Sequence, residues 1–147
     1  MPTPALHIDN AGPEAPWLVL VHGMSQDHRV FDAQVTAFRR THRVLLVDLP
    51  DHGLAADVGG PYGHVEMGGH VADALTDAGA AAVRFWGTHT GATLGLYLAA
   101  TRPEMIAALV LEGPLIPGAN PPIVIDTLAA TRAIVETEGL AAAIDFW

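Results

Sequence analysis

Runs of consecutive apolar residues alternate along this chain with segments whose apolar residues recur at helical spacing. The apolar runs cover residues 16–21, 43–47, 81–86 and 105–111, and a shorter one covers residues 6–9. A strand that is covered on both faces of a parallel sheet is continuously apolar rather than alternating. We therefore predict strands at these positions, in a sheet of about five or six strands.

Helical periodicity lies between and after these runs. It predicts helices over residues 30–38, 64–77 and 92–100, and one or two amphipathic helices over residues 125–146. Strands and helices that alternate in this way form an α/β fold with a doubly wound, mostly parallel sheet. The strand residues that we expect in the core are Val19, Leu20, Val21, Leu45, Val47, Val83, Phe85, Leu109 and Leu111.

Composition narrows the classes of function. Half of the 147 residues are hydrophobic, which is enough to bury the core of one domain. The net charge is -9 and the few arginines are scattered, which argues against nucleic acid or an anionic membrane as the partner. Cysteine is absent, which excludes disulfides and a thiolate nucleophile. No signal-peptide pattern and no apolar run of about 20 residues is present, so we expect a cytoplasmic protein.

Residues 87–91, G-T-H-T-G, have the outline of a nucleophile elbow, G-x-S-x-G, with His89 in place of the serine. The segment lies between a predicted strand and a predicted helix, which is the context that this motif requires. The chain's only serine, Ser25, lies in an earlier loop, and we expect the side chains of Thr88 and Thr90 to point away from the pocket. His89 is therefore the reactive group expected at the apex, and no histidine follows it to act as a base.

The chemistry of His89 depends on its protonation. A helix N-terminus disfavours the imidazolium form, so we expect a neutral ring at pH 7. A neutral imidazole accepts a proton, attacks an acyl or phosphoryl group, or binds a metal. Two interpretations stay open. Either the serine was lost together with the activity and His89 fills the floor of the pocket, or residues absent from this chain complete its chemistry.

Four segments together resemble the α/β-hydrolase superfamily, in its epoxide-hydrolase and lactonase-like branch with a helical cap. They are His22-Gly23 after the second apolar run, residues 48–53 (D-L-P-D-H-G), the elbow at residues 87–91, and the run 105–111 followed by Glu112. The turn at residues 48–53 resembles the family's D-x-P-G-x-G, although Asp51 replaces a glycine. The likeness covers almost the whole chain.

This resemblance implies that residues 1–113 form the N-terminal part of an α/β-hydrolase core and that residues 114–147 begin its cap, so that the fold is truncated within the cap region. It implies activity on a small ester, lactone or epoxide, with a downstream catalytic acid and base that this chain lacks. We therefore expect the isolated chain to have negligible esterase activity. The alternative is a non-catalytic protein that binds a small molecule or a partner on the same scaffold.

The resemblance also implies an oxyanion hole made by two backbone N–H groups, those of Met24, which follows His22-Gly23, and of Thr90. Backbone donors survive side-chain substitution, so an anion or a carbonyl oxygen still has a binding site there. The alternative is a pair of hydrated amides. Glu112 occupies the position of the catalytic acid in some branches of the family. Its alternative role, which we favour, is that of a loop carboxylate at the hinge of the cap.

Other polar residues follow the strands. We expect Asp48 and Asp51 to fix the turn after their strand through side-chain-to-backbone hydrogen bonds. His22, His52 and His89 each follow a different strand at the carboxyl edge of the sheet, where α/β folds bind ligands, and three imidazoles are a potential zinc site. Because the family's ordinary motifs already account for His22 and His52, we expect no metal and no cofactor.

The expected partners follow from the same features. We expect a small-molecule substrate or ligand, and neither nucleic acid nor a membrane. The run 105–111 is interior in the family's sheet, flanked by strands that this chain does not contain. As an open edge it favours a homodimer through edge pairing, unless the cap helices fold over it.

Overall fold

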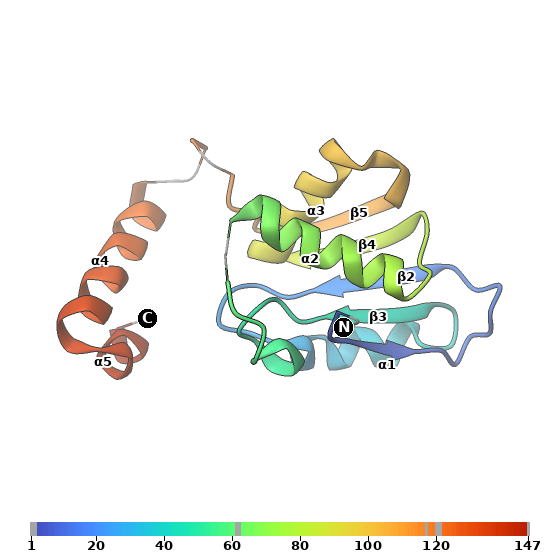
Figure 1. The fold of residues 1–147 in the computed structure, drawn as a ribbon, viewed down its shortest axis with the longest axis horizontal. Helices are drawn as coiled ribbons and strands as arrows, with labels where there is room; N and C mark the ends of the chain where they lie inside the picture. Colours follow the sequence, from blue (N-terminus) through green and yellow to red (C-terminus); the bar gives the residue numbers. More distant parts are fainter. Residues whose placement is uncertain (1–2, 61–62, 117, 120–121, 147) are drawn as a thin grey trace. The chain divides into compact units, whose positions relative to one another are not determined.

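The computed structural model describes residues 3–60, 63–116, 118–119 and 122–146. The chain divides into two compact units, Met1–Pro114 and Leu115–Trp147. The first unit is a five-stranded sheet with helices on both faces, which confirms the predicted α/β class (Figure 1). The assignment of the second unit as the start of a cap stays a prediction.

The strands lie at or close to their predicted positions. They are β1 (Ala5–Ile8), β2 (Trp17–Val21), β3 (Arg43–Val47), β4 (Val83–Thr88) and β5 (Ile106–Glu112). The sheet order is β1-β3-β2-β4-β5, and β1 is antiparallel to β3 while the other pairs are parallel. Because β2 and β4 are neighbours, with Val21 opposite Gly87, the loops that follow them meet at one edge of the sheet.

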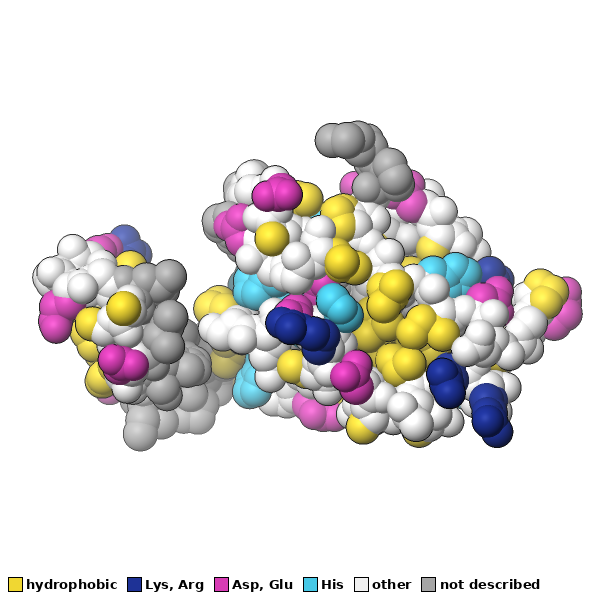
Figure 2. All heavy atoms as spheres, turned by 90° about the horizontal axis from the view of Figure 1, so that it is seen from below, with side chains coloured by type: hydrophobic (Ala, Val, Ile, Leu, Met, Phe, Trp, Pro, Cys, Tyr) yellow, Lys and Arg dark blue, Asp and Glu magenta, His cyan; other side chains and the backbone are white. Residues whose placement is uncertain are grey.

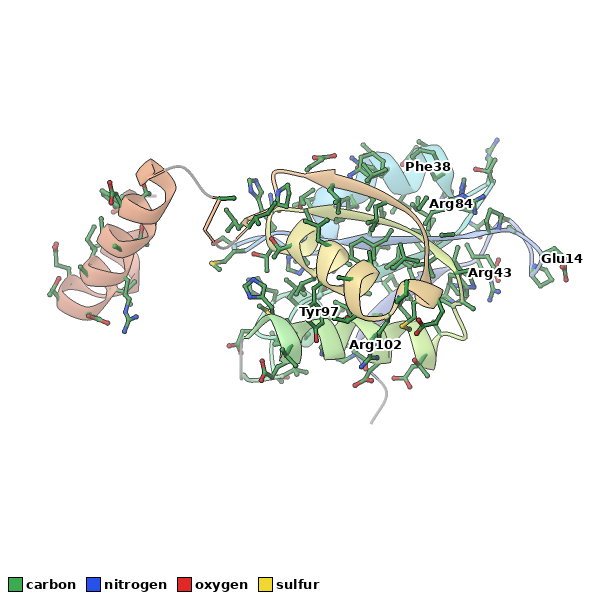
Figure 3. All side chains as sticks on the ribbon, turned by 90° about the horizontal axis from the view of Figure 1, so that it is seen from above. Glu14, Phe38, Arg43, Arg84, Tyr97 and Arg102 are labelled. Carbon is green, nitrogen blue, oxygen red and sulfur yellow. The ribbon has the colours of Figure 1, made fainter. Side chains whose placement is uncertain are left out.

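Helices cover the two faces of the sheet. α1 (Asp32–Phe38) packs on one face, and α2 (His64–Asp77) and α3 (Thr90–Thr101) pack on the other. Figure 3 shows this arrangement, with Phe38 on the side of α1 and Tyr97 on the opposite side. Short 3-10 turns occupy His28–Phe31, Gly53–Ala55 and Pro103–Met105.

The core has two layers because alternate residues of a strand face opposite sides of the sheet. The layer under α2 and α3 contains the strand residues Val19, Val21, Leu45, Val47, Val83 and Phe85. The layer under α1 contains Leu18, Leu20, Val44 and Leu46, packed against Phe31. All the core residues that we predicted in β2, β3 and β4 are buried.

The core prediction was correct only in part for β5, whose Leu109 is half-buried but packs against the core. Leu109 and Leu111 are half-buried, and Val110 is 47% exposed. Among the described strands β5 pairs with β4 alone, and it forms an edge of the sheet (Figure 1). A continuous apolar run predicts a strand that is covered on both sides, but an edge strand lacks a neighbour along its length. Its apolar side chains are therefore less buried than the same sequence predicts.

The second unit consists of two helices, α4 (Pro122–Glu138) and α5 (Leu140–Phe146), which pack against each other. Gly139 joins them with φ +90°, and its N–H donates to the carbonyl groups of Ile134 and Val135. A glycine in the left-handed region is the usual residue after a helix C-terminus. Within the described residues, no helix combines the length and apolar character needed to cross a membrane.

Exposed apolar side chains follow the carboxyl ends of two central strands. Met24 after β2 is 59% exposed, Leu54 after β3 is 52% exposed, and Val65 in the first turn of α2 is 63% exposed. On the face drawn in Figure 2, the arginines lie in separate small groups among apolar, acidic and histidine side chains.

We predict that β5 drives self-association. Its outer edge presents backbone N–H and C=O groups that no described strand pairs, and it carries no lysine. Light scattering over a concentration series should show dimers or larger species of the wild-type chain. Val110→Lys should shift the protein toward the monomer, because a lysine on an edge strand opposes pairing.

Val65→Lys is the matched control, since it places the same charge at an exposed valine on α2. It should leave association unchanged. A wild-type chain that stays monomeric at the highest concentration would show that the edge of β5 is covered in solution.

Candidate active site

His89 is the apex of a sharp turn between β4 and α3. Its backbone has φ 45° and ψ −109°, a region that non-glycine residues rarely adopt. Its N–H donates to the carbonyl of Glu112 at 2.8 Å, and its own carbonyl accepts the N–H of Thr93 at 3.0 Å. Backbone strain of this kind costs about 1–3 kcal/mol and is concentrated at functional sites. The turn therefore has the geometry expected of a nucleophile elbow.

Two glycines make this turn sterically possible. A Cβ on Gly87 would lie 2.4 Å from the carbonyl carbon of Gly91, and a Cβ on Gly91 would lie 2.1 Å from the carbonyl oxygen of Val21. The N–H of Gly91 donates to the carbonyl of His22 at 3.1 Å. The first turn of α3 is thus in direct contact with the end of β2, and no side chain fits between them.

The imidazole of His89 is exposed and lies between two glycines. A Cβ on Gly23 would lie 3.3 Å from its Cδ2, and a Cβ on Gly113 would lie 3.5 Å from its Cε1 and its Nδ1. Nε2 is the ring atom between Cε1 and Cδ2, so it is at the outer end of the ring. In the part of the chain that the structure describes, neither ring nitrogen has a hydrogen-bond partner.

The loop after β2 is held beside the elbow by Gln26. Its Oε1 accepts the N–H of Gly23 at 3.1 Å and the hydroxyl of Thr88 at 3.4 Å. The amides of Met24 and Thr90 make no hydrogen bond within the described residues. Their assignment as an oxyanion hole stays a prediction, and their free N–H groups are compatible with it.

His22 connects the loops after β2 and β3. The ring is fully buried; its Nε2 accepts the N–H of Leu49 at 3.0 Å, so its Nδ1 carries the proton and donates to the carbonyl of Gly23 at 2.7 Å. Burial lowers the pKa of His22 below its ordinary value of 6.5, against the opposing effects of the Gly23 carbonyl and Asp48. The neutral ring fixes the path of the loop that carries Gly23.

Asp48 is the buried acceptor at the end of β3. Its carboxylate accepts the backbone N–H of His28 at 2.6 Å and that of Leu54 at 2.8 Å, and it also contacts His28 Nδ1 at 2.6 Å and His22 Nε2 at 3.4 Å. The expected side-chain-to-backbone role of Asp48 is confirmed. Asp51 has φ 63°, in the left-handed region that favours glycine but that aspartate also enters. Aspartate therefore fits this position, where the D-x-P-G-x-G turn that the segment resembles has a glycine.

Glu112 is exposed at the end of β5. One of its carboxylate oxygens accepts the indole N–H of Trp86 at 2.7 Å, while its backbone carbonyl accepts the N–H of His89. The structure therefore places the main chain of Glu112 at the elbow and its carboxylate on Trp86. A catalytic role for this carboxylate stays a prediction.

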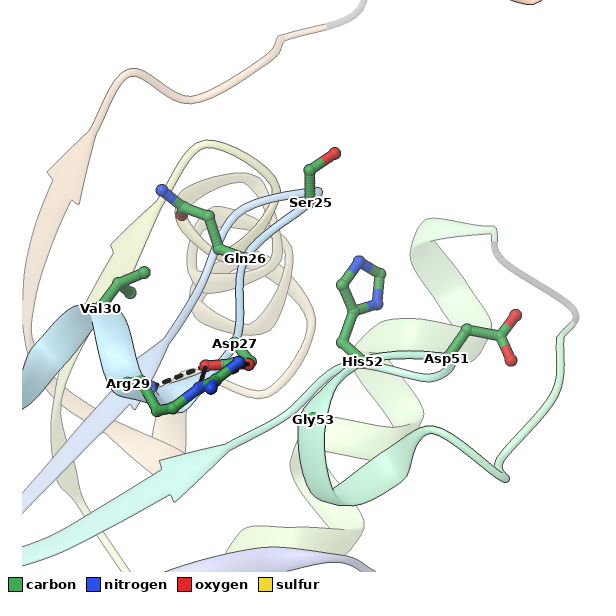
Figure 4. A pocket seen from close by; sticks show the side chains of 8 residues that line it. All are labelled: Ser25, Gln26, Asp27, Arg29, Val30, Asp51, His52 and Gly53. Carbon is green, nitrogen blue, oxygen red and sulfur yellow. Dashed lines mark hydrogen bonds and ion pairs between the residues drawn. The ribbon is translucent and has the colours of Figure 1, made fainter. Parts of the chain in front are cut away.

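An open pocket of about 610 Å³ lies beside the loops after β2 and β3 (Figure 4). Ser25, with φ 63°, is on its rim together with His52, whose Nδ1 donates to the carbonyl of Pro50 at 2.7 Å. The guanidinium of Arg29 donates to both oxygens of Asp27 and holds the pKa of that carboxyl well below its usual range. The single serine is thus a loop residue, away from the apex of the elbow.

The three histidines at the carboxyl edge of the sheet, where we expected no metal, are not equivalent. Both ring nitrogens of His22 are used by Gly23 and Leu49, and the ring of His52 lies 5.1 Å from that of His22. Among the described residues, no group of three or more His, Asp or Glu side chains is arranged to hold a metal ion.

The sequence interpretation missed Gln26, His28 and Trp86. Gln26 and His28 anchor the loop after β2, and the indole N–H of Trp86 donates to the carboxylate of Glu112. The spacing of Gln26, three residues after Gly23, was a signal for a local side-chain-to-backbone bond. The partners of His28 and Trp86 are 20 and 26 residues away in sequence, so no local pattern indicates them.

The sequence matches a family model and, over 69–72% of its length, individual proteins of known name. A family model described as the alpha/beta hydrolase fold matches residues 16–138. A pimeloyl-(acyl-carrier protein) methyl ester esterase of Xanthomonas campestris pv. campestris (strain B100) is 36% identical over 107 residues, which cover 72% of this chain and 40% of that protein. A 2-succinyl-6-hydroxy-2,4-cyclohexadiene-1-carboxylate synthase of Enterobacter sp. (strain 638) is 31% identical over 106 residues, 69% of this chain and 38% of that protein. The chain thus spans well under half the length of these relatives.

Solved structures agree with this match. The enol-lactonase from Burkholderia xenovorans LB400 superposes with a TM-score of 0.77 at 25% identity, covering 96% of this chain and 53% of that chain. MGS-M2, an alpha/beta hydrolase enzyme from a Medee basin deep-sea metagenome library, gives a TM-score of 0.82 at 20% identity, covering 97% and 51%. The second likeness concerns the fold alone.

We predict that Gly91→Ala strongly destabilises the protein. The new methyl group would collide with the carbonyl oxygen of Val21, which is backbone and cannot move aside, so we expect a loss of at least about 2 kcal/mol in the free energy of unfolding. Gly69→Ala is the control, because nothing lies within 4 Å of its added Cβ. It should stabilise helix α2 by about 0.5–1 kcal/mol. Urea unfolding measures both, and equal effects would contradict the close approach at Gly91.

We also predict that His22 makes stability depend on pH. Because burial holds its pKa below 6.5 in the folded protein, the unfolded chain binds a proton at a pH where the folded chain does not. Its contribution is complete above pH 6.5 and is lost as the pH falls toward the folded pKa. Between pH 8 and about pH 5, the free energy of unfolding should therefore decrease less for His22→Gln than for the wild type. Parallel pH profiles would refute this assignment.

Proposed function

The chain belongs to the α/β-hydrolase fold family, and from this premise we propose that its elbow binds the electrophilic group of a small ester, lactone or epoxide. The observation that supports this proposal is the strained apex at His89, with φ 45° and ψ −109°, beside two amides that have no partner among the described residues. In the proposal, the N–H groups of Met24 and Thr90 hold the substrate oxygen. The exposed side chains of Met24, Leu54 and Val65 favour a mostly apolar substrate.

The relatives support the class of substrate. The protein that is 36% identical is named as a methyl ester esterase, and the structure that is 25% identical is an enol-lactonase. Both names describe enzymes that act on an acyl–oxygen bond. Since this chain spans 40% of the esterase, we propose that the base of a triad comes from outside these 147 residues, and that its acid is either Glu112 or a residue outside them.

A non-catalytic binding protein is the second candidate. It is favoured by the absence of a hydroxyl at the apex, since Ser25 lies in a loop. In that case the same two amides bind a carboxylate or a carbonyl oxygen without turning it over. The two candidates share the oxygen-binding site and differ in the chemistry that follows.

The test is a titration of the chain with sodium butyrate, followed by ¹⁵N–¹H NMR. We expect saturable shifts of the Met24 and Thr90 amides, because a carboxylate oxygen accepts from both. Gly79 and Ala80, at the amino end of β4, should not move. His89→Ala should keep the shifts, since the donors are backbone groups. The absence of saturable shifts at the two amides would refute the proposed site.

A further inference from the structure

We propose that His89 is itself the nucleophile and that it accepts acyl groups from thioesters, aryl esters and enol esters. This inference rests on the proposed function, because the same two amides must hold the acyl oxygen. It starts from the ring of His89, which is exposed and has no hydrogen-bond partner among the described residues. The hydroxyl of Thr88 is bonded to Gln26 and Thr90 is 7% exposed, so neither competes at the apex.

The geometry directs one nitrogen outward. The Nδ1–Cε1 side of the ring lies along Gly113 and the Cδ2 side lies along Gly23, which leaves Nε2 at the open end. Met24 follows Gly23 in sequence, and Thr90 follows His89. In the proposed complex, the acyl carbon is bonded to Nε2 and its oxygen faces these two amides.

A neutral imidazole differs from serine in what it needs. Serine must lose its proton to a base before or during attack, and this chain has no histidine beyond the elbow to take it. The lone pair of a neutral imidazole nitrogen attacks directly, and histidine is among the residues that form covalent intermediates. The missing base is therefore no obstacle to acylation of His89.

Acyl transfer to His89 proceeds by addition of Nε2, loss of the leaving group and hydrolysis. Nε2 adds to the acyl carbon, and the electrons of the C=O bond move to its oxygen, which the Met24 and Thr90 amides stabilise. The oxyanion collapses, the bond to sulfur or oxygen breaks, and the thiolate, phenolate or enolate leaves with its electron pair. Nδ1 then gives its proton to water, which leaves a neutral N-acylimidazole. Water hydrolyses this to the carboxylic acid and regenerates the imidazole.

The leaving group sets the substrate class. The tetrahedral intermediate expels the weaker base, and an alkoxide is a much stronger base than a neutral imidazole. An alkyl ester therefore returns to the starting ester, whereas thiolates, phenolates and enolates leave. The chain accordingly remains inactive on simple alkyl esters, for which the missing parts of a triad are required.

The test uses p-nitrophenyl acetate as acyl donor and methyl acetate as the alkyl control. We expect p-nitrophenol release at least about tenfold faster than from free imidazole at the same concentration, since one oxyanion donor contributes about 10²–10³ in rate. Protein separated from the donor by rapid gel filtration should carry one acetyl group, mapped to His89 by peptide mass spectrometry and removed by hydroxylamine. Methyl acetate should give no adduct.

Three variants control the result. His89→Gln should lose the adduct and the rate enhancement, and His64→Gln, which removes another exposed histidine, should keep both. His89→Ser should not restore the rate, because its hydroxyl lacks a base. Circular dichroism checks that each variant is folded.

The outcomes separate the two proposals. If butyrate shifts the Met24 and Thr90 amides but the wild type gains no acetyl group on His89, the nucleophile proposal is overturned and the binding site stands. Acetylation that is no faster at His89 than at His64 also overturns it. If butyrate moves neither amide, the proposed function fails, and with it the premise of this inference.

Discussion

The close approach of α3 to the end of β2 is the constraint on which the site depends. At Gly91 the backbone of the helix comes so near to Val21 that even a methyl group would collide with its carbonyl oxygen. Gly87 is also crowded against the first turn of α3, and the chain reverses between these glycines with a positive φ at His89. The imidazole is thereby raised above the sheet edge instead of being buried in the helix packing.

A buried polar network holds the neighbouring loops against this turn. Asp48 and His22 are both fully buried. Asp48 accepts the backbone N–H groups of His28 and Leu54, and His22 accepts that of Leu49. An unpaired carboxylate or a charged imidazole at this depth would carry a large desolvation penalty, so the network is stable only when every partner is in place. The position of Gly23, and of the Met24 amide after it, is thus set by groups that do not contact a ligand.

Replacing serine by histidine at such an apex changes the chemistry more than the structure. The strained backbone, the flanking glycines and the two amides depend on the turn and not on the side chain of residue 89. The oxygen-binding role that we propose for the two amides therefore does not require a triad. As the nucleophile that we propose, histidine carries its own lone pair, and this would restrict turnover to acyl groups with weakly basic leaving groups.

The sequence by itself determined the order of the elements and the location of the elbow, because apolar runs, helical periodicity and glycine spacing are local signals. It predicted the burial of Val19, Leu45 and Phe85, but not the half-exposure of Leu109 and Leu111. Their exposure depends on which strand lies at the edge of the sheet, and the sequence of β5 does not indicate which strands flank it. The tertiary structure alone decided that Glu112 bonds Trp86 and that His22 is neutral, because both follow from contacts between distant segments and from burial.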